Sequence, residues 1–272
     1  MATKATLQSV VGEAINHFQQ YGFTSQAALD EWVGKIRRQA LLRLQTPAQT
    51  EIELRRLLGA KYRSLVTQRG VLTGMPEVSR GTLERVKPKL RRELDRRIMA
   101  SANLIKLNRA QAVDKTLQRF QGWATSIPAG GSRAVEKGKE SENIRKSIGK
   151  MSFIERRVSI DQSHKLVAAI RDIVAVEAGA IAVRWHSPWR RPGYNFRKDH
   201  KERDEKVWAI RDCWAFEKGF MKAGPNGYYD EITQVGEEVY CSCTAEYIFA
   251  LRKLPVEMLT KAGMYAIPAR AA

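Results

Sequence analysis

Apolar residues recur at helical spacing through the first half of the chain, and they predict a succession of amphipathic helices. The first run, from Leu7 to Phe18, ends at Gly22. Ser25 is placed to cap a second helix, because its hydroxyl can accept hydrogen bonds from the free backbone N–H groups of the first turn. Thr46-Pro47 gives the same start signal for a third helix, since proline needs no N–H partner at the first helical position.

A long helix is expected next, after a break between Gly70 and Gly81. We expect Pro88 in its first turn, and its apolar residues keep helical spacing as far as Phe120. The following stretch, residues 122–150, is rich in lysine, glycine and serine and has few apolar residues to bury. This composition predicts a linker or a mobile arm. Alternatively, residues 141–148 form a short helix docked on a partner.

The last part of the chain changes from helical to alternating spacing. Asp161 or Ser163 is expected to open a helix that Gly179 ends in a left-handed conformation. Three strand-like runs and a short final helix follow, at residues 181–186, 206–214, 238–251 and 256–264. These elements predict an α+β fold with a small antiparallel β-sheet. The expected regions are a basic helical region (1–121), a lysine-rich linker (122–150) and the α+β domain (151–272).

Composition adds a strong positive charge to this picture. The 272-residue chain has 47 Lys and Arg against 29 Asp and Glu, a formal net charge of +18. Such a surplus bears on partners rather than on fold, and it favours contact with a polyanion such as nucleic acid. A basic protein with no such partner is the alternative.

The number of cysteines and the hydropathy of the sequence indicate the cellular compartment of the protein. Three cysteines do not make an even disulfide framework, which favours a reducing environment. The N-terminus lacks the apolar core of a signal peptide, and no apolar run approaches the roughly 18 residues of a membrane span. We therefore expect no contact with a membrane.

Two basic segments are the candidate nucleic-acid contacts. The opening of the long helix carries an excess of positive charges, whereas surface helices usually alternate positive and negative residues in stabilising pairs. The alternative is that these residues form an ordinary solvated helix face. The loop 189–203 interleaves cations with aromatic residues, which can stack on bases or close the core beneath the loop. The candidate residues are Lys87, Lys89, Arg91, Arg92, Arg96, Arg97, Arg190, Arg191, Arg197, Lys198, Lys201 and Arg203.

Cys241 and Cys243 form a Cys-x-Cys pair in the last predicted strand. Residues two apart on a strand lie about 6.5 Å apart, whereas two sulfurs on one tetrahedral zinc ion lie about 3.8 Å apart. Chelation would need a bend and outside ligands, such as His200 with Cys213 or His186. We therefore expect packed cysteines, with no metal and no cofactor.

His200 and Asp204 are spaced so that they share a face if the segment is helical, and they could then hydrogen-bond as an acid–base pair. No nucleophile or metal cluster accompanies them, so we expect a structural pair that fixes the basic loop to the sheet, with no catalytic residue. The phosphate-loop, dinucleotide-binding, zinc-protease and nucleophile-elbow motifs are absent from the sequence. The sequence therefore predicts that the protein is not an enzyme.

The order of these features resembles one known family, the Mu F-like head-morphogenesis proteins of tailed phages. The resemblance covers about Asp161 to Leu251. It rests on a helix that leads to a strand ending in Trp185-His186-Ser187, then on His200 and Asp204, Lys206-Val207-Trp208, and the pair Cys241 and Cys243. The family often has Gly after the Asp and Cys-Arg-Cys at the end, where this chain has Glu205 and Ser242.

The resemblance implies a minor capsid protein of a bacteriophage virion, a structural component near the portal vertex that acts in head morphogenesis and contacts DNA. The implied partners are capsid or portal proteins and double-stranded DNA, and the implied locations are the virion and, during assembly, the host cytoplasm. A homo-oligomer is left open. Two alternatives remain: a phage-encoded metal-dependent nuclease using His200, and a free nucleic-acid-binding protein without a role in the virion.

Overall fold

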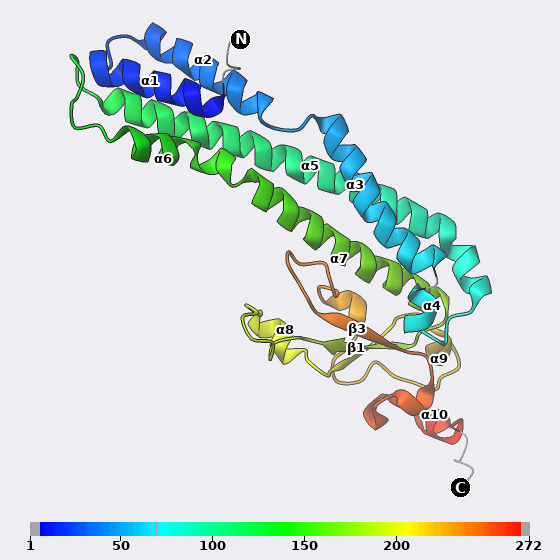
Figure 1. Ribbon diagram of the computed structural model, residues 1–272. Coiled ribbons are helices and arrows are strands. Elements are labelled where there is room, and N and C mark those ends of the chain that lie inside the picture. The colour runs from blue at the N-terminus through cyan, green and yellow to red at the C-terminus, as the bar shows by residue number, and fades with distance from the viewer. Residues whose placement is uncertain (1–5, 69, 268–272) are drawn as a thin grey trace. The chain divides into compact units, whose positions relative to one another are not determined.

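The structure, a computed structural model, describes residues 6–68 and 70–267 and is mainly helical with one small β-sheet (Figure 1). This arrangement confirms the predicted α+β class. The helices are α1 (Leu7–Tyr21), α2 (Gln26–Leu42), α3 (Pro47–Tyr62), the π-turn η1 (Arg63–Thr67), α4 (Gly70–Gly74), α5 (Arg80–Ser126), α6 (Lys137–Gly149), α7 (Met151–Glu177), α8 (Lys198–Glu202), α9 (Trp214–Glu217) and α10 (Lys261–Tyr265). Short 3₁₀ turns lie at Tyr229–Glu231, Leu251–Lys253 and Val256–Met258.

The chain forms two compact units, each made of two separate segments. Unit 1 contains Met1–Leu54 and Met99–Ser159, and unit 2 contains Arg55–Ile98 and Ile160–Ala272. The boundaries fall inside α3, α5 and α7. This division reflects which residues contact one another in space. It differs from the three regions expected from the sequence, 1–121, 122–150 and 151–272, which are defined by composition along the chain.

Hydroxyl caps open the first three helices. The Thr6 hydroxyl accepts from the backbone N–H of Ser9 at 3.1 Å, and the Ser25 hydroxyl accepts from Ala28 at 3.2 Å. Thr46 caps α3 in the same way, by accepting from the N–H of Gln49 at 3.2 Å. The predicted start signals at Ser25 and Thr46-Pro47 are therefore confirmed.

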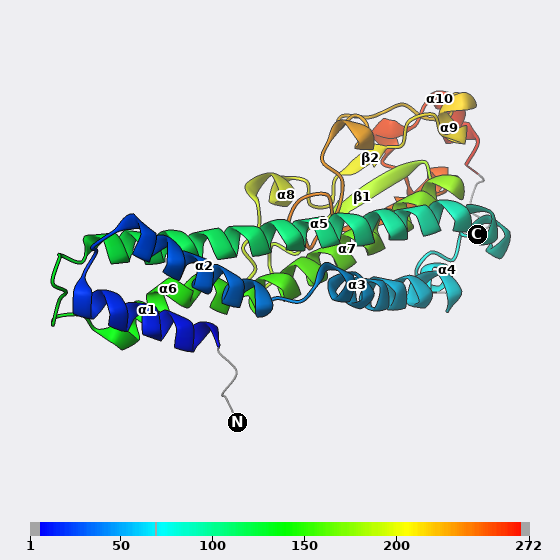
Figure 2. The same cartoon turned by 90° about the horizontal axis from the view of Figure 1, so that it is seen from above.

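The core of unit 1 unites α1, α2, the C-terminal half of α5 and α6, as the two views of the helices show (Figures 1 and 2). Phe18 and Phe120 meet edge to face with their ring centroids 5.7 Å apart. Ile144 and Ile148 of α6 are buried in the same core. The prediction that residues 122–150 have too few apolar side chains to bury is wrong for 137–149, because two isoleucines four residues apart suffice to dock one face of a short helix.

The long helix α5 starts earlier than its proline suggests. The Ser79 hydroxyl accepts from the N–H of Thr82 at 3.0 Å and caps the helix, so Pro88 lies in the helix interior and not in the first turn. Pro88 is exposed, so its ring faces solvent rather than a neighbouring helix. The cap at Ser79 therefore sets the start of α5.

Helix α7 also starts before the predicted caps. It runs without interruption from Met151 through Asp161 and Ser163, because the intervening residues include no glycine or proline to stop it. Asp161 has another role: its carboxylate accepts from the backbone N–H of Tyr240 at 2.6 Å. Gly179, with φ of 87°, ends the helical segment in the left-handed conformation, as predicted.

The sheet of unit 2 has three antiparallel strands in the order β2-β1-β3. Strand β1 (Ala182–His186) begins one residue after the start of its predicted range, 181–186, and ends where predicted. It pairs Val183 with Trp208 on one side and with Tyr247 on the other. Strands β2 (Val207–Ala209) and β3 (Thr244–Ile248) are shorter than predicted. Asp212 and Tyr240, with φ of 54° and 59°, lie in the left-handed region, which is incompatible with an extended strand at those positions.

Residues of all three strands belong to a second apolar cluster, which lies within unit 2. Buried members of this cluster include Ile181, Ala209, Ile248 and Met258, and Trp214 packs against it from α9. Within the described residues, no helix combines the length and the apolar character that a membrane span requires.

Candidate functional site

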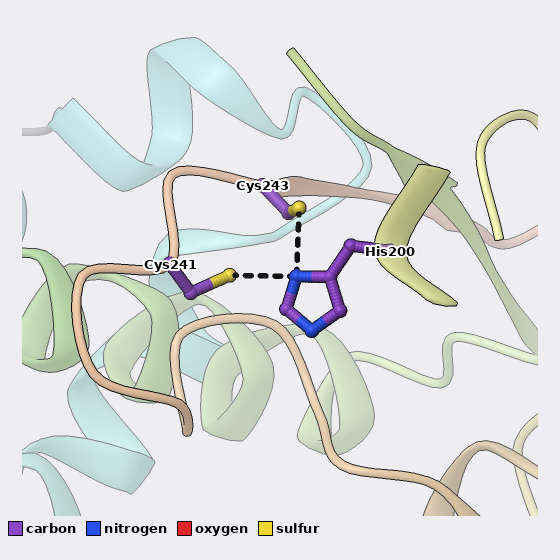
Figure 3. Close-up of side chains that lie close together, drawn as sticks. All are labelled: His200, Cys241 and Cys243. Atoms are coloured by element: carbon purple, nitrogen blue, oxygen red, sulfur yellow. Dashed lines mark hydrogen bonds between the residues drawn. The ribbon is translucent and has the colours of Figure 1, made fainter. Parts of the chain in front are cut away.

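A bend before β3 brings both cysteines to the same histidine. Tyr240 turns the chain with its left-handed φ, so Cys241 and Cys243 lie in an irregular segment and not on the strand. Both sulfurs point at Nδ1 of His200, at 3.7 Å from Cys241 and 3.5 Å from Cys243 (Figure 3). The expectation of two packed cysteines on a straight strand is therefore wrong in geometry, because the backbone bends where a strand was predicted.

Hydrogen bonds hold the bent segment in place. The N–H of Tyr240 donates to the Asp161 carboxylate on α7, and the N–H of Ser242 donates to the Tyr194 hydroxyl at 3.2 Å. The segment is thus attached both to α7 and to the basic loop. This attachment fixes the directions of the flanking cysteine side chains.

His200 comes from α8 and is almost fully enclosed, with 1% of its surface exposed. Its ring packs edge on against Trp185 of β1, with centroids 5.2 Å apart. On the side away from the cysteines, its Nε2 lies 3.5 Å from Glu238 and 3.8 Å from Asp199. Sequence reasoning missed Glu238, although its position three residues before Cys241 places it on the same bent segment.

The two thiols hold their protons unequally. The pKa of the Cys241 thiol is lowered to about 5, chiefly by a hydrogen bond with Cys243, with smaller contributions from the backbone N–H groups of Gly236 and Cys243. The same hydrogen bond is the main cause that raises the pKa of the Cys243 thiol, and burial adds to the rise. The pair therefore favours one thiolate and one thiol, joined by a shared proton.

Asp204 does not bond to His200, contrary to the expected pair. Its two carboxylate oxygens accept from the backbone N–H of Ser187 and from the indole N–H of Trp189, each at 2.8 Å. Asp204, at the end of the basic loop, therefore holds the start of the loop at Ser187 and Trp189. The expected structural role remains, but its partners are Ser187 and Trp189, because His200 turns inward to the cysteines.

The other suggested outside ligands lie apart from this cluster. Cys213 is buried beside Met221, with 3.7 Å between the sulfurs. His186 lies between two carboxylates, 2.9 Å from Glu205 and 3.3 Å from Glu246. Neither residue belongs to the group formed by His200, Cys241 and Cys243.

A cavity of about 250 Å³ adjoins the cysteines within unit 2. Both cysteines line it, and Lys61, His164 and Arg171 provide basic side chains on its walls. The cavity gives solvent a route to the sulfurs, while His200 stays enclosed.

The basic loop presents cations over aromatic rings. Arg190 and Lys201 both lie over Trp189, at 4.4 and 4.3 Å from the ring, and Arg191 lies over Tyr194 at 5.3 Å. All three cations are exposed. In the described part of the chain, Arg191 and Lys201 form no ion pair, so their charges remain available to a polyanion.

Two other arginines of the loop are occupied. Arg197 pairs with Glu238 and donates to the carbonyl of Val239 at 2.8 Å. Arg203 pairs with Asp199 at 3.1 Å and donates to Thr233. Lys198 is exposed and lies 4.0 Å from Glu202. Arg190 is exposed and lies 4.0 Å from Asp204. The loop thus presents Arg190, Arg191, Lys198 and Lys201 to solvent, and uses Arg197 and Arg203 internally.

The basic opening of α5 is largely neutralised by nearby carboxylates. Glu93 pairs with both Arg96 and Arg97, at 2.6 and 2.8 Å. Three more pairs join Lys87 to Glu84, Lys89 to Glu177, and Arg91 to Asp95. Among residues 6–68 and 70–267, only Arg92 of the six candidate cations on this helix forms no ion pair. The loop is therefore the stronger candidate contact for nucleic acid.

Comparisons of this chain with protein-family models, with curated proteins and with solved structures found no match.

Proposed function

We propose that this protein is a minor head protein of a tailed phage, a structural component of the virion that contacts packaged DNA through sequence-independent charge. The observation that carries the proposal is the meeting of the separate motif residues beside one small sheet. His200 contacts Cys241 and Cys243, although more than 40 residues separate them along the chain. Asp204 ties the loop to the end of β1.

The charge of the loop supports contact with DNA. Four cations lie exposed on one short segment, and three of them, Arg190, Arg191 and Lys201, lie over aromatic rings. Charges arranged in this way bind phosphates without reading base edges, which suits a protein that must accept any packaged sequence.

The geometry gives less support to the nuclease alternative. A general acid or base must reach the substrate within hydrogen-bonding distance. His200 is 1% exposed, and both of its ring nitrogens face protein groups. The histidine that the alternative relies on is therefore placed for a structural task.

Purified particles provide the test. We expect the chain to copurify with density-banded virions at a fixed number of copies per particle, detected by mass spectrometry. It should remain after washing in high salt, since protein contacts as well as charge would hold it. A phage lacking the gene should give defective heads, and a copy of the gene supplied in trans should restore them.

Absence of the chain from washed virions, together with normal heads in the deletion, would contradict the proposal. In that case DNA binding by the purified protein would support a free nucleic-acid-binding role.

A further inference from the structure

We propose that His200, Cys241 and Cys243 bind one zinc ion, with Nδ1 of the imidazole and the two thiolate sulfurs as its protein ligands. The proposal does not depend on the function proposed above. It rests on the geometry, burial and surroundings of the cluster in unit 2 (Figure 3).

The distances suit tetrahedral coordination. A zinc ion about 2.3 Å from sulfur and about 2.0 Å from nitrogen places those two ligand atoms about 3.5 Å apart. The observed Nδ1–Sγ distances are 3.7 Å for Cys241 and 3.5 Å for Cys243, and all three ligand atoms lie within 4.8 Å of one another. The ligands can therefore close on an ion without movement of the backbone.

The ligand chemistry selects the metal. Two thiolates with one imidazole form a soft donor set, which favours zinc over magnesium or calcium. Zinc binds both sulfurs as thiolates, so binding releases the remaining thiol proton to solvent, and the two negative sulfurs then balance the charge of the divalent ion. A neutral unit of this kind can be buried at low cost, which suits the enclosed position of all three residues.

The surroundings of the ligands fit a metal-bound state. A metal-ligating histidine usually directs its other N–H at a carboxylate. Nε2 of His200 lies 3.5 Å from Glu238, yet no hydrogen bond of normal geometry satisfies it. Coordination at Nδ1 places the proton on Nε2, where a small rotation of the ring would bring it to this carboxylate.

Donor groups also surround the sulfurs. The backbone N–H groups of Gly236 and Cys243 are directed at Cys241, while the indole N–H of Trp185 and the hydroxyl of Ser187 lie beside Cys243. Trp185 Nε1 and Ser187 Oγ are buried, and neither forms a hydrogen bond of normal geometry. Thiolates bound to zinc accept more readily than thiols, so metal binding gives these two groups their partners.

The cavity beside the cysteines provides the fourth ligand. Both sulfurs line this space of about 250 Å³, so a water molecule can reach an ion held between them. The site would then have three protein ligands and one solvent ligand, an open type of zinc coordination.

Elemental analysis of the full chain, purified without a metal-binding tag from zinc-containing medium, tests the assignment. We expect about one zinc per chain. The double variant C241S/C243S should lose nearly all of it, whereas Cys213→Ser should keep it, because Cys213 is a buried cysteine outside the cluster. A chelator should lower the melting temperature of the wild type and of Cys213→Ser.

Two measurements on the wild type keep the test decisive if the double variant does not fold. Cobalt substituted for zinc should give tetrahedral d–d absorption and a thiolate charge-transfer band. Chelation should increase the rate at which two thiols per chain react with a thiol reagent. A folded wild type that contains no zinc, takes up none when it is added, and melts at the same temperature with chelator would overturn the proposal, as would stoichiometric iron or copper in its place.

Discussion

At the scale of single residues, burial sets acid–base properties that the spacing of residues along the sequence does not predict. The carboxylate of Asp172 on α7 accepts a hydrogen bond from the Tyr247 hydroxyl of β3 at 3.2 Å. Burial raises the pKa of Asp172, the Tyr247 hydroxyl lowers it, and the nearby charge of Glu237 raises it. Nothing in the sequence distinguishes Asp172 from an exposed aspartate, because its environment comes from a strand 75 residues away.

Asp172 should therefore give the folded protein a specific pH dependence. A carboxyl group with a raised folded pKa stabilises the fold fully below its unfolded pKa of about 4, and that contribution is lost as pH rises through the folded pKa. The variant Asp172→Asn stays neutral throughout. We expect its stability relative to the wild type to increase between pH 4 and pH 7, by about 1.4 kcal/mol for each unit by which the folded pKa is raised.

Urea unfolding of both proteins across this pH range measures the difference. The exposed Asp114→Asn serves as the control, and its difference from the wild type should stay nearly flat. If Asp172→Asn also gives a flat difference, the carboxyl group is not shifted in the folded state.

At the scale of elements, helix α6 shows how little apolar surface can fix a helix. Its composition is polar and lysine-rich, and only Ile144 and Ile148 are buried. Arg119 of α5 donates to Ser147 at 2.7 Å and adds a polar contact within unit 1. The two isoleucines convert a stretch that resembles a linker into part of a core.

Replacing Ile144 with alanine should destabilise the protein by about 2–4 kcal/mol, through lost burial and the cavity left behind. The matched change Glu142→Ala, at an exposed position of the same helix, should alter the free energy of unfolding by less than about 0.5 kcal/mol. Chemical denaturation gives both values.

Trypsin should also cut Ile144→Ala between residues 137 and 150 faster than it cuts the wild type, because the undocked helix unfolds locally. Equal cutting of the two proteins would mean that α6 is not held by this side chain.

At the scale of the whole molecule, the net charge of +18 does not mean that all basic side chains are equally free to contact phosphates. Carboxylates pair with five of the six candidate cations on α5. The loop exposes Arg190, Arg191, Lys198 and Lys201, of which, among the residues that the structure describes, only Arg190 and Lys198 lie near a carboxylate, each at 4.0 Å. Net charge from composition therefore overstates the number of cations that are free to meet phosphates.

Binding to duplex DNA should depend steeply on salt, with log K falling by about 0.9 per unit of log salt for each phosphate contacted. Two variants with equal loss of charge separate the surfaces. Serine at Arg190, Arg191, Lys198 and Lys201 should reduce the slope by about 0.9 for each cation that contacts a phosphate. Serine at the paired residues Lys87, Lys89, Arg96 and Arg97 should change it much less.

Fluorescence anisotropy with a short duplex, at several salt concentrations, gives these slopes. Equal losses in the two variants would show that binding follows net charge and not the loop. No binding even at low salt would remove DNA from the list of partners.

Sequence alone determined the elements that depend on neighbours along the chain. The caps at Ser25 and Thr46, the left-handed Gly179 and the alternating strand β1 follow from local backbone chemistry, and each was predicted where it is found. The charge surplus and the α+β class also follow from composition and spacing.

Tertiary structure decided what depends on distant partners. Asp204 could have bonded to His200 by spacing, but it bonds to Ser187 and Trp189, because the loop folds back on the end of β1. On a straight strand Cys241 and Cys243 would share one face but lie about 6.5 Å apart, too far to meet at one ligand. Only the turn at Tyr240, held by Asp161 of α7, directs both at His200. The chain supplied the three candidate ligands, and the long-range contacts of the fold supplied the bend that lets them act on one ion.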